Sequence, residues 1–155
     1  MTQKERNRIL KQHRQWLETD GVEGQRADLE DANLRRAGLE LARLSRANLS
    51  RANLQLARLY FANLCDADLR GTDLEDANLQ NADLRDADLR NANLRNADFR
   101  CAKLQGAELD TNIRNCWSFA GAKFTSDALP WLILHPKWAE WKDTVQIEEV
   151  RYGAA

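Results

Sequence analysis

The amino-acid sequence predicts an all-β solenoid, in which the chain turns every fifth residue and winds into a closed coil. The first observation is a series of seventeen apolar residues spaced by five, which runs from Leu29 to Leu109. The second is an alanine two positions before each of them, from Ala27 to Ala107, with Thr72 as the single exception. The third is the residue between the two, which is mostly Asp or Asn. The repeating unit is therefore Ala-(Asp/Asn)-Leu-x-x.

A period of five does not suit either common element of secondary structure. Five residues of an α-helix advance by about 500°, so successive leucines would spread around every face. On a flat strand, an odd period would place successive leucines on opposite faces. The Ala, Leu and Arg content favours helix, but the repeated Asp and Asn favour turns, and we give the periodicity more weight. Only a chain that turns at a fixed interval buries every Ala and Leu.

The tandem unit between Ala27 and Leu109 resembles the pentapeptide-repeat family. The resemblance implies a right-handed quadrilateral parallel β-helix, in which each pentapeptide forms one side of a square and four form one coil. It also implies that the Leu and the Ala two positions before it point inward, while the other three positions point outward. Residues 22–126 would then form about five coils.

Residues 1–21 predict an N-terminal α-helical cap. Thr2-Gln3-Lys4-Glu5 has the pattern of a capping box. The apolar stripe that follows is Ile9, Leu10, Trp16 and Leu17, with His13 between them, and it extends to about Thr19 before Gly21. The open end of a solenoid exposes apolar side chains and unpaired backbone, so we expect this helix to cover the first coil. A targeting or partner-binding helix is the alternative.

Residues 127–155 predict a C-terminal, helical and tryptophan-rich cap. The segment contains Trp131, Trp138 and Trp141, and His135-Pro136 suits the start of a helix. Its apolar content exceeds what one small coil requires, so we expect it to cap the coil and also to form a two-fold homodimer contact. A monomeric cap with internally buried tryptophans is the alternative.

The repeat is interrupted just before this segment. Arg114 stands where the period requires an apolar residue, and Ile113 comes one place early. A bulge between Asn112 and Asn115 that turns Ile113 inward would restore the register. Decay of the repeat explains the break, and a functional loop is the alternative.

Four outward positions carry apolar residues where polar ones are the rule, namely Leu41, Leu56, Tyr60 and Phe61. Leu41 and Phe61 are twenty residues apart, so they should lie directly above one another on adjacent coils. Clustered exposed apolar side chains indicate a contact surface. We therefore expect this cluster to bind a protein partner, unless the tryptophan-rich segment folds back over it.

An acidic column follows another face of the predicted coil. It consists of Asp28, Asp68, Asp88 and Glu108. Some pentapeptide-repeat proteins are similar to a DNA duplex in size and shape, bind DNA gyrase and confer quinolone resistance, so the resemblance implies gyrase modulation as an alternative function. Imitation of DNA needs a strongly negative surface, whereas Arg70 and Arg90 flank this column and the net charge of the chain is -1.

The composition points away from most other function classes. The 155 residues suit one domain, and there is no run of about 18 apolar residues for a membrane helix and no global positive charge for nucleic acid. Three cysteines, Cys65, Cys101 and Cys116, are expected outward on different sides, in a reducing cytoplasm. His13 and His135 lie in opposite terminal segments, so we expect no metal, cofactor or catalytic site. The sequence thus predicts a non-catalytic scaffold for an unidentified protein partner.

Overall fold

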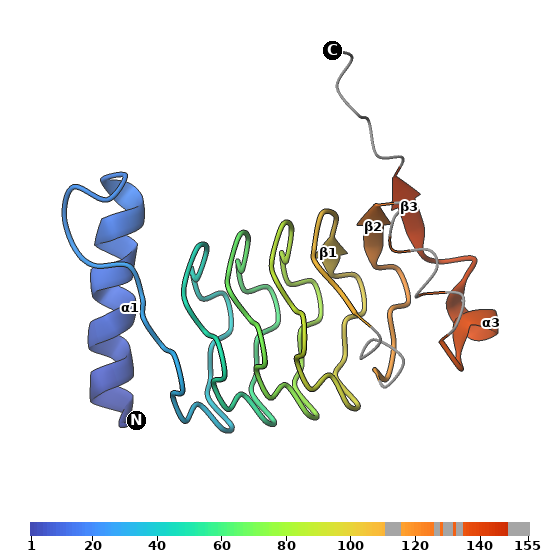
Figure 1. Ribbon diagram of the computed structural model, residues 1–155, viewed down its shortest axis with the longest axis horizontal. Coiled ribbons are helices and arrows are strands. Elements are labelled where there is room, and N and C mark those ends of the chain that lie inside the picture. The colour runs from blue at the N-terminus through green and yellow to red at the C-terminus, as the bar shows by residue number, and fades with distance from the viewer. Residues whose placement is uncertain (111–115, 126–127, 129–131, 133–134, 149–155) are drawn as a thin grey trace, which may run out of the picture.

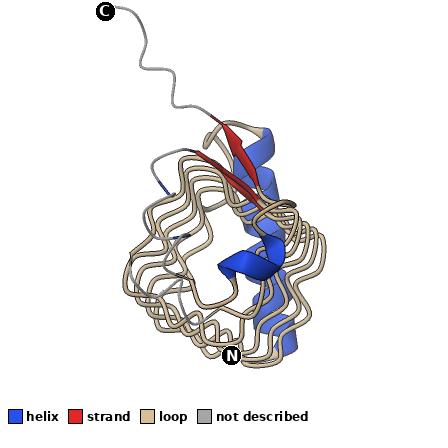
Figure 2. Ribbon diagram, turned by 90° about the vertical axis from the view of Figure 1, so that its right-hand side faces the viewer, coloured by secondary structure: helices blue, strands red, loops and turns tan. Residues whose placement is uncertain are grey.

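The computed structural model describes residues 1–110, 116–125, 128, 132 and 135–148 (Figure 1). In chain order the elements are α1 (Gln3–Glu18), β1 (Lys103–Leu104), β2 (Lys123–Thr125), α3 (Trp138–Trp141) and β3 (Gln146–Glu148). Between α1 and β1 the chain consists of stacked coils, which Figure 2 shows superposed when viewed along their axis.

A ladder of parallel pairs joins residues twenty apart and defines the coil. It begins with the pair Asp28–Asn48 and continues to the pair Asp98–Ser118. The Leu29 N–H donates to the Asn48 carbonyl oxygen at 2.7 Å, and the Asn48 N–H donates to the Ala27 carbonyl oxygen at 2.9 Å. Each coil therefore contains four five-residue sides, as the resemblance to pentapeptide-repeat proteins implied. The strands β1, β2 and β3 extend the ladder as a parallel sheet in that order.

The chain turns at the second residue after each inward leucine, here called the corner residue. The Ala32 N–H donates to the Leu29 carbonyl oxygen at 3.1 Å, which closes a turn with Asp31 at its corner. The corner residues have positive φ, from 55° at Asp31 to 61° at Arg46 among the non-glycine ones. This left-handed backbone, repeated at every side, bends the chain into a square.

The interior is filled by the repeated apolar residues. Every central Leu from 29 to 104 is at most 2% exposed, and the alanines two positions before them alternate with them. Burial of each leucine is worth roughly 1.5–3 kcal/mol, which makes this column the main source of stability. Thr72, the one exception among the alanines, is fully buried and donates its hydroxyl to the Leu49 carbonyl oxygen at 2.9 Å.

Helix α1 lies against the first coil (Figure 1). It begins with the predicted capping box between Thr2 and Glu5. The side chains of Ile9 and Leu10 pack on the core. His13 is fully buried, and its Nδ1 accepts a hydrogen bond from the Ala27 N–H at 3.0 Å. This bond joins the helix to the first residue of the repeat.

The other end of the coil carries the C-terminal segment. Strand β3 pairs with β2 so that Ile147 stands beside Phe124. Trp138, which begins α3, is half-buried and packs on the core, and α3 lies beyond the last coil (Figures 1 and 2). Trp131 and the side chain of Trp141 lie outside the described residues.

The prediction that Cys116 points outward is wrong. Cys116 is only 5% exposed, whereas Trp117 is 54% exposed. The Trp117 N–H donates to the Ala97 carbonyl oxygen at 3.0 Å, a bond made one coil earlier by Asp98 to Ala77. Cys116 therefore occupies the inward alanine position one residue early, and Trp117 and Ser118 together face Asp98 as a bulge. The bulge predicted at 112–115 lies outside the described residues.

Candidate interaction surface

Three of the four outward apolar residues meet at one edge of the coil. Leu41 is 71% exposed, Phe61 is 56% exposed and Tyr60 is 36% exposed. The Leu41 N–H donates to the Tyr60 carbonyl oxygen at 3.2 Å, so the residues sit on adjacent coils. The rings of Tyr60 and Phe61 meet edge to face with their centroids 6.3 Å apart. We call Leu41, Tyr60 and Phe61 the apolar corner.

Leu56 does not belong to this group. It is half-buried and lies at the other edge of the same face, where it lines a groove of about 680 Å³ with Asn78, Asp98 and Trp117. The guanidinium of Arg100 lies 5.7 Å from the centre of the Trp117 ring. Of the predicted cluster of four, Leu41, Tyr60 and Phe61 lie together and Leu56 lies apart.

The sequence analysis gave Trp117 no place on this face. A signal was present, because the strict period puts position 117 at an inward alanine site. A tryptophan cannot fit between stacked alanines, so the register had to shift around it. The shift explains both the exposure of Trp117 and the burial of Cys116.

Backbone conformation makes the apolar corner unusual. Leu41 and Phe61 both have a φ of 59°. Side chains other than those of Gly, Asn and Asp disfavour this left-handed region by about 1 kcal/mol. Asn81 continues the same column one coil further on and has a residue type suited to its φ of 57°. The fold therefore does not require Leu41 or Phe61 where they stand.

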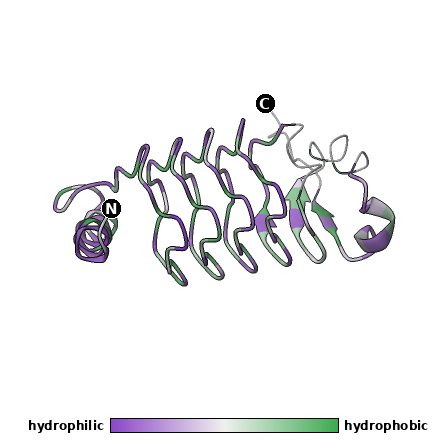
Figure 3. Cartoon of the chain, turned by 90° about the horizontal axis from the view of Figure 1, so that it is seen from below, coloured by the Kyte–Doolittle hydropathy of each residue, from purple (hydrophilic) through white to green (hydrophobic). Residues whose placement is uncertain are grey.

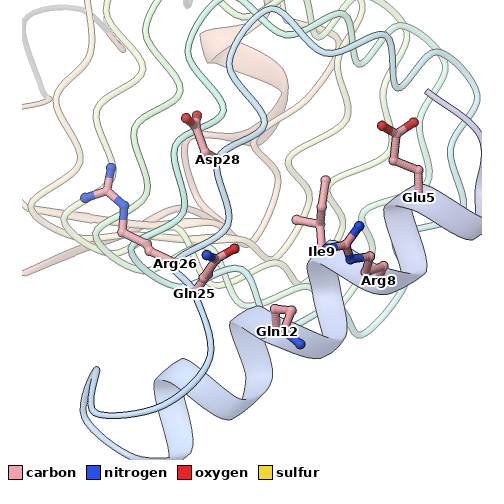
Figure 4. A pocket seen from close by; sticks show the side chains of 7 residues that line it. All are labelled: Glu5, Arg8, Ile9, Gln12, Gln25, Arg26 and Asp28. Carbon is pink, nitrogen blue, oxygen red and sulfur yellow. The ribbon is translucent and has the colours of Figure 1, made fainter.

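Two hollows flank α1. The first, of about 320 Å³, separates the helix from the apolar corner and is lined by Leu10, Arg14, Leu41 and Arg43 among others. We call it the helix cleft. The second, of about 280 Å³, lies on the other side of the helix between Arg8 and Gln12 of α1 and the segment 25–28 (Figure 4). Ile9 is the apolar residue that lines it, whereas the helix cleft is lined by Leu41 of the apolar corner.

The acidic column is largely neutralised by neighbouring arginines. The column members are Asp28, Asp68, Asp88 and Glu108. Arg70 contacts Asp68 at 2.6 Å, and Arg90 contacts Asp88 at 2.6 Å and Glu108 at 3.0 Å. Hydrogen bonds from these arginines hold the pKa values of the Asp68 and Asp88 carboxyl groups below their ordinary range. The column is thus a row of ion pairs rather than a free negative stripe.

The buried titratable groups have structural roles. His135 Nε2 lies 3.1 Å from the Cys116 carbonyl oxygen, and its Nδ1 accepts from the Lys137 N–H at 3.0 Å. Burial lowers the pKa of His135 and of His13, and burial raises the pKa of the Cys116 thiol. Within the described residues, no group of three or more His, Cys, Asp or Glu side chains could hold a metal ion. No described helix has the length and apolar character to cross a membrane.

The sequence model of pentapeptide repeats matches this chain in overlapping segments that together span residues 25–116, with eight copies of the repeat. The chain belongs to the pentapeptide-repeat family. Members of this family form right-handed β-helices, and the twenty-residue ladder with a turn every five residues has that architecture. Among curated proteins no match was found.

Solved structures of pentapeptide-repeat proteins are similar to this chain. A protein from the Arabidopsis thaliana thylakoid lumen is 31% identical over 64% of this chain and 66% of its own, with a TM-score of 0.38. A protein from Nostoc PCC 7120 is 31% identical over 89% of this chain and 93% of its own, with a TM-score of 0.35. A plasmid-mediated fluoroquinolone resistance protein is 16% identical over 74% of each chain, with a TM-score of 0.36.

Proposed function

We propose that this pentapeptide-repeat protein is a non-catalytic interaction module that binds another protein through the apolar corner. The observation that carries the proposal is the pair Leu41 and Phe61, stacked on adjacent coils in a backbone conformation that disfavours both. Exposure of two large apolar side chains adds no stability, and the left-handed backbone costs some. A binding partner accounts for residues that the fold itself does not favour.

The packed interior also supports a function on the surface. Leucine side chains fill the coil from residue 29 to residue 104 with at most 2% exposure. Such a core leaves no central space for a substrate. The function of the molecule then depends on what its outward side chains contact.

Gyrase modulation has less support as a function. A DNA mimic must present uncompensated negative charge to a surface built for phosphates. Here Asp68, Asp88 and Glu108 are engaged by Arg70 and Arg90. We expect the purified protein to leave gyrase supercoiling and its poisoning by fluoroquinolones unchanged. Protection of gyrase at micromolar protein would restore this alternative.

The homodimer through the C-terminal segment stays a prediction. Its support is the position of β3 at the end of the described ladder, next to the half-buried Trp138 and Ile147. We expect light scattering coupled to size-exclusion chromatography to report twice the chain mass of 17.8 kDa. A single-chain mass at high micromolar concentration would remove the dimer from the proposal.

The apolar corner can be tested without damage to the fold. We expect the double variant Leu41→Asn, Phe61→Asn to fold with unchanged or higher stability and to lose capture of the partner from native lysate. Leu56→Asn is the matched control, because it makes the same change at the same backbone conformation on another edge. Equal capture by both variants and the native chain would rule out the apolar corner.

A further inference from the structure

We infer that the segment bound at the apolar corner is a stretch of protein chain that combines acidic residues with apolar side chains. This inference rests on the proposed function and specifies the chemistry of the partner. It follows from the distribution of charge around the corner, the shape of the helix cleft and the identity of the neighbouring corner residues.

The charge of the chain is unevenly distributed along the coil. Residues 1–60 contain twelve basic and eight acidic side chains, whereas residues 61–110 contain six basic and eleven acidic ones. Leu41 and Tyr60 lie within the basic part, residues 1–60, and Phe61 directly follows it. Figure 3 shows that α1, which borders the helix cleft, is mainly hydrophilic. A partner that approaches the apolar corner therefore meets a positive field.

Two acidic groups near the apolar corner are engaged by arginines, whereas Asp66, the corner residue after Phe61, has no basic side chain within ion-pair distance among the described residues. Glu18 contacts Arg43 at 2.9 Å, and Glu40 forms an ion pair with Arg58. Burial of a negatively charged partner here therefore meets little unpaired negative charge from these two groups.

Three arginines around the apolar corner form no ion pair with a described carboxylate. Among the residues that the structure describes, Arg14, Arg36 and Arg46 have no carboxylate within ion-pair distance. Arg14 lines the helix cleft, and Arg36 and Arg46 are the corner residues on either side of Leu41 along the chain. Their charges are free for an acidic partner, and such pairs increase the rate of association and select the partner.

The helix cleft gives a side chain of the partner a place to insert. Leu10 of α1 and Leu41 of the apolar corner line it together with the charged side chains of Arg14, Glu40 and Arg43. A concave hollow of about 320 Å³ accepts a protruding side chain of a protein segment. A flat anionic membrane would contact the exposed side chains of Leu41 and Phe61 but not the hollow, so a protein segment fits better.

The six consecutive corner residues from 36 to 61 have the same mixed chemistry. They are Arg36, Leu41, Arg46, Arg51, Leu56 and Phe61. All six have positive φ, which disfavours Arg, Leu and Phe alike. Basic and apolar residues thus occur at corners where the backbone favours neither. Leu41 and Phe61 share one edge of the coil, Arg36 and Leu56 share the edge before it, and Arg46 stands on the edge after it.

Selection from a random-peptide display library on the immobilised full-length chain tests this inference. We expect the enriched peptides to carry an excess of Asp and Glu together with Leu, Ile or Phe. Synthetic peptides of these sequences should bind roughly tenfold more weakly when salt rises from about 50 mM to about 200 mM.

Two variants separate the two parts of the inference. Leu41→Asn with Phe61→Asn should abolish binding of the selected peptides. Arg14→Gln with Arg36→Gln and Arg46→Gln should weaken it roughly tenfold at low salt. Arg85→Gln with Arg90→Gln and Arg95→Gln is the matched control, because it removes the same charge from the later coils and should leave binding unchanged.

Other outcomes would overturn the inference alone or the proposed function with it. Peptides that need Leu41 and Phe61 but carry no acidic excess, and bind the Arg14 triple variant normally, overturn the inference and leave the proposed function intact. Peptides that bind independently of Leu41 and Phe61 overturn both. Vesicles of phosphatidylglycerol that bind the native chain but not the Leu41 double variant, with no peptide enriched, replace the protein partner by a membrane.

Discussion

The corner residues of the early and late coils have the same backbone and different side chains. The early corners, residues 36 to 61, have φ between 56° and 61°, and the late corners, residues 66 to 106, have φ between 56° and 72°. The late corners are Asp66, Gly71, Asp76, Asn81, Asp86, Asn91, Asn96, Cys101 and Gly106. All of these except Cys101 are residue types suited to a left-handed backbone. The six early corners from 36 to 61 are Arg, Leu and Phe, whereas the corner before them is Asp31.

This difference separates what the fold requires from what it only tolerates. In the late coils, the residue type at each corner follows from the backbone. In the early coils it does not, although the interior and the hydrogen-bonded ladder are the same in both regions. The early corners therefore mark the part of the surface whose composition needs an explanation other than stability.

Loss of an interior leucine should have the largest effect and should be equal in the two regions. Leu59 and Leu79 are both fully buried, in the same column of adjacent coils. We expect Leu59→Ala and Leu79→Ala each to lower the free energy of unfolding by about 2–5 kcal/mol, because each leaves a cavity. Urea unfolding measures both. A much smaller loss for Leu59→Ala would mean that the early coils are packed differently, and the comparison would fail.

Acid should weaken the molecule through its buried histidines. Burial lowers the pKa of His13 and His135 from the ordinary 6.5, so the unfolded chain binds more protons than the folded one. Stability is then complete above about pH 6.5 and decreases as the pH falls below it, by up to about 1.4 kcal/mol per pH unit for each histidine.

The early end of the coil contributes to this acid response through His13, whose Nδ1 accepts from the Ala27 N–H only when unprotonated. Between pH 7 and about pH 5, the free energy of unfolding should therefore change less with pH in the His13→Gln variant than in the native chain. If the pH dependence of the unfolding free energy is the same in that variant and the native chain, folding does not lower the pKa of His13.

Exchange of residue types between the corners should have smaller and opposite effects. We expect Leu41→Asn with Phe61→Asn to raise the free energy of unfolding by up to about 1 kcal/mol, because Asn suits the left-handed backbone. Asn81→Leu with Asn91→Leu should lower it by a similar amount. Thermal unfolding of the two double variants makes the comparison. If both double variants shift the free energy of unfolding in the same direction, the residue preference at the early corners differs from that at the late corners.

Removal of an exposed ion pair should have the smallest effect. Arg90 contacts Asp88 and Glu108 at the surface, where water and salt screen the interaction. We expect Arg90→Gln to leave the urea midpoint unchanged within error, as Arg51→Gln should in the early coils. A clear loss in either variant would give surface pairs a structural role.

The repeat could be predicted from the sequence because its information is local. Each Ala and Leu has its role fixed by the period, and the described bridge pairs from Asp28–Asn48 to Asp98–Ser118 all join residues twenty apart. The capping box of α1 is likewise contained in four consecutive residues. Such features need no knowledge of distant contacts.

The surface was only partly predictable because it depends on side chains that meet across coils. The period places Leu41 above Phe61, but it does not show that Leu56 lies half-buried at the other edge. It does not show which carboxylate each arginine contacts. Cys116 was misplaced because a bulge of one residue reverses which side chain points inward.

Affinity and stability measured on one protein preparation test the central claim most directly. The native chain and the Leu41→Asn, Phe61→Asn double variant are titrated with the same selected acidic peptide and unfolded in the same buffer. The account predicts that the variant loses the peptide while its unfolding free energy stays equal or rises. A variant that is less stable than the native chain and still binds the peptide would contradict the claim.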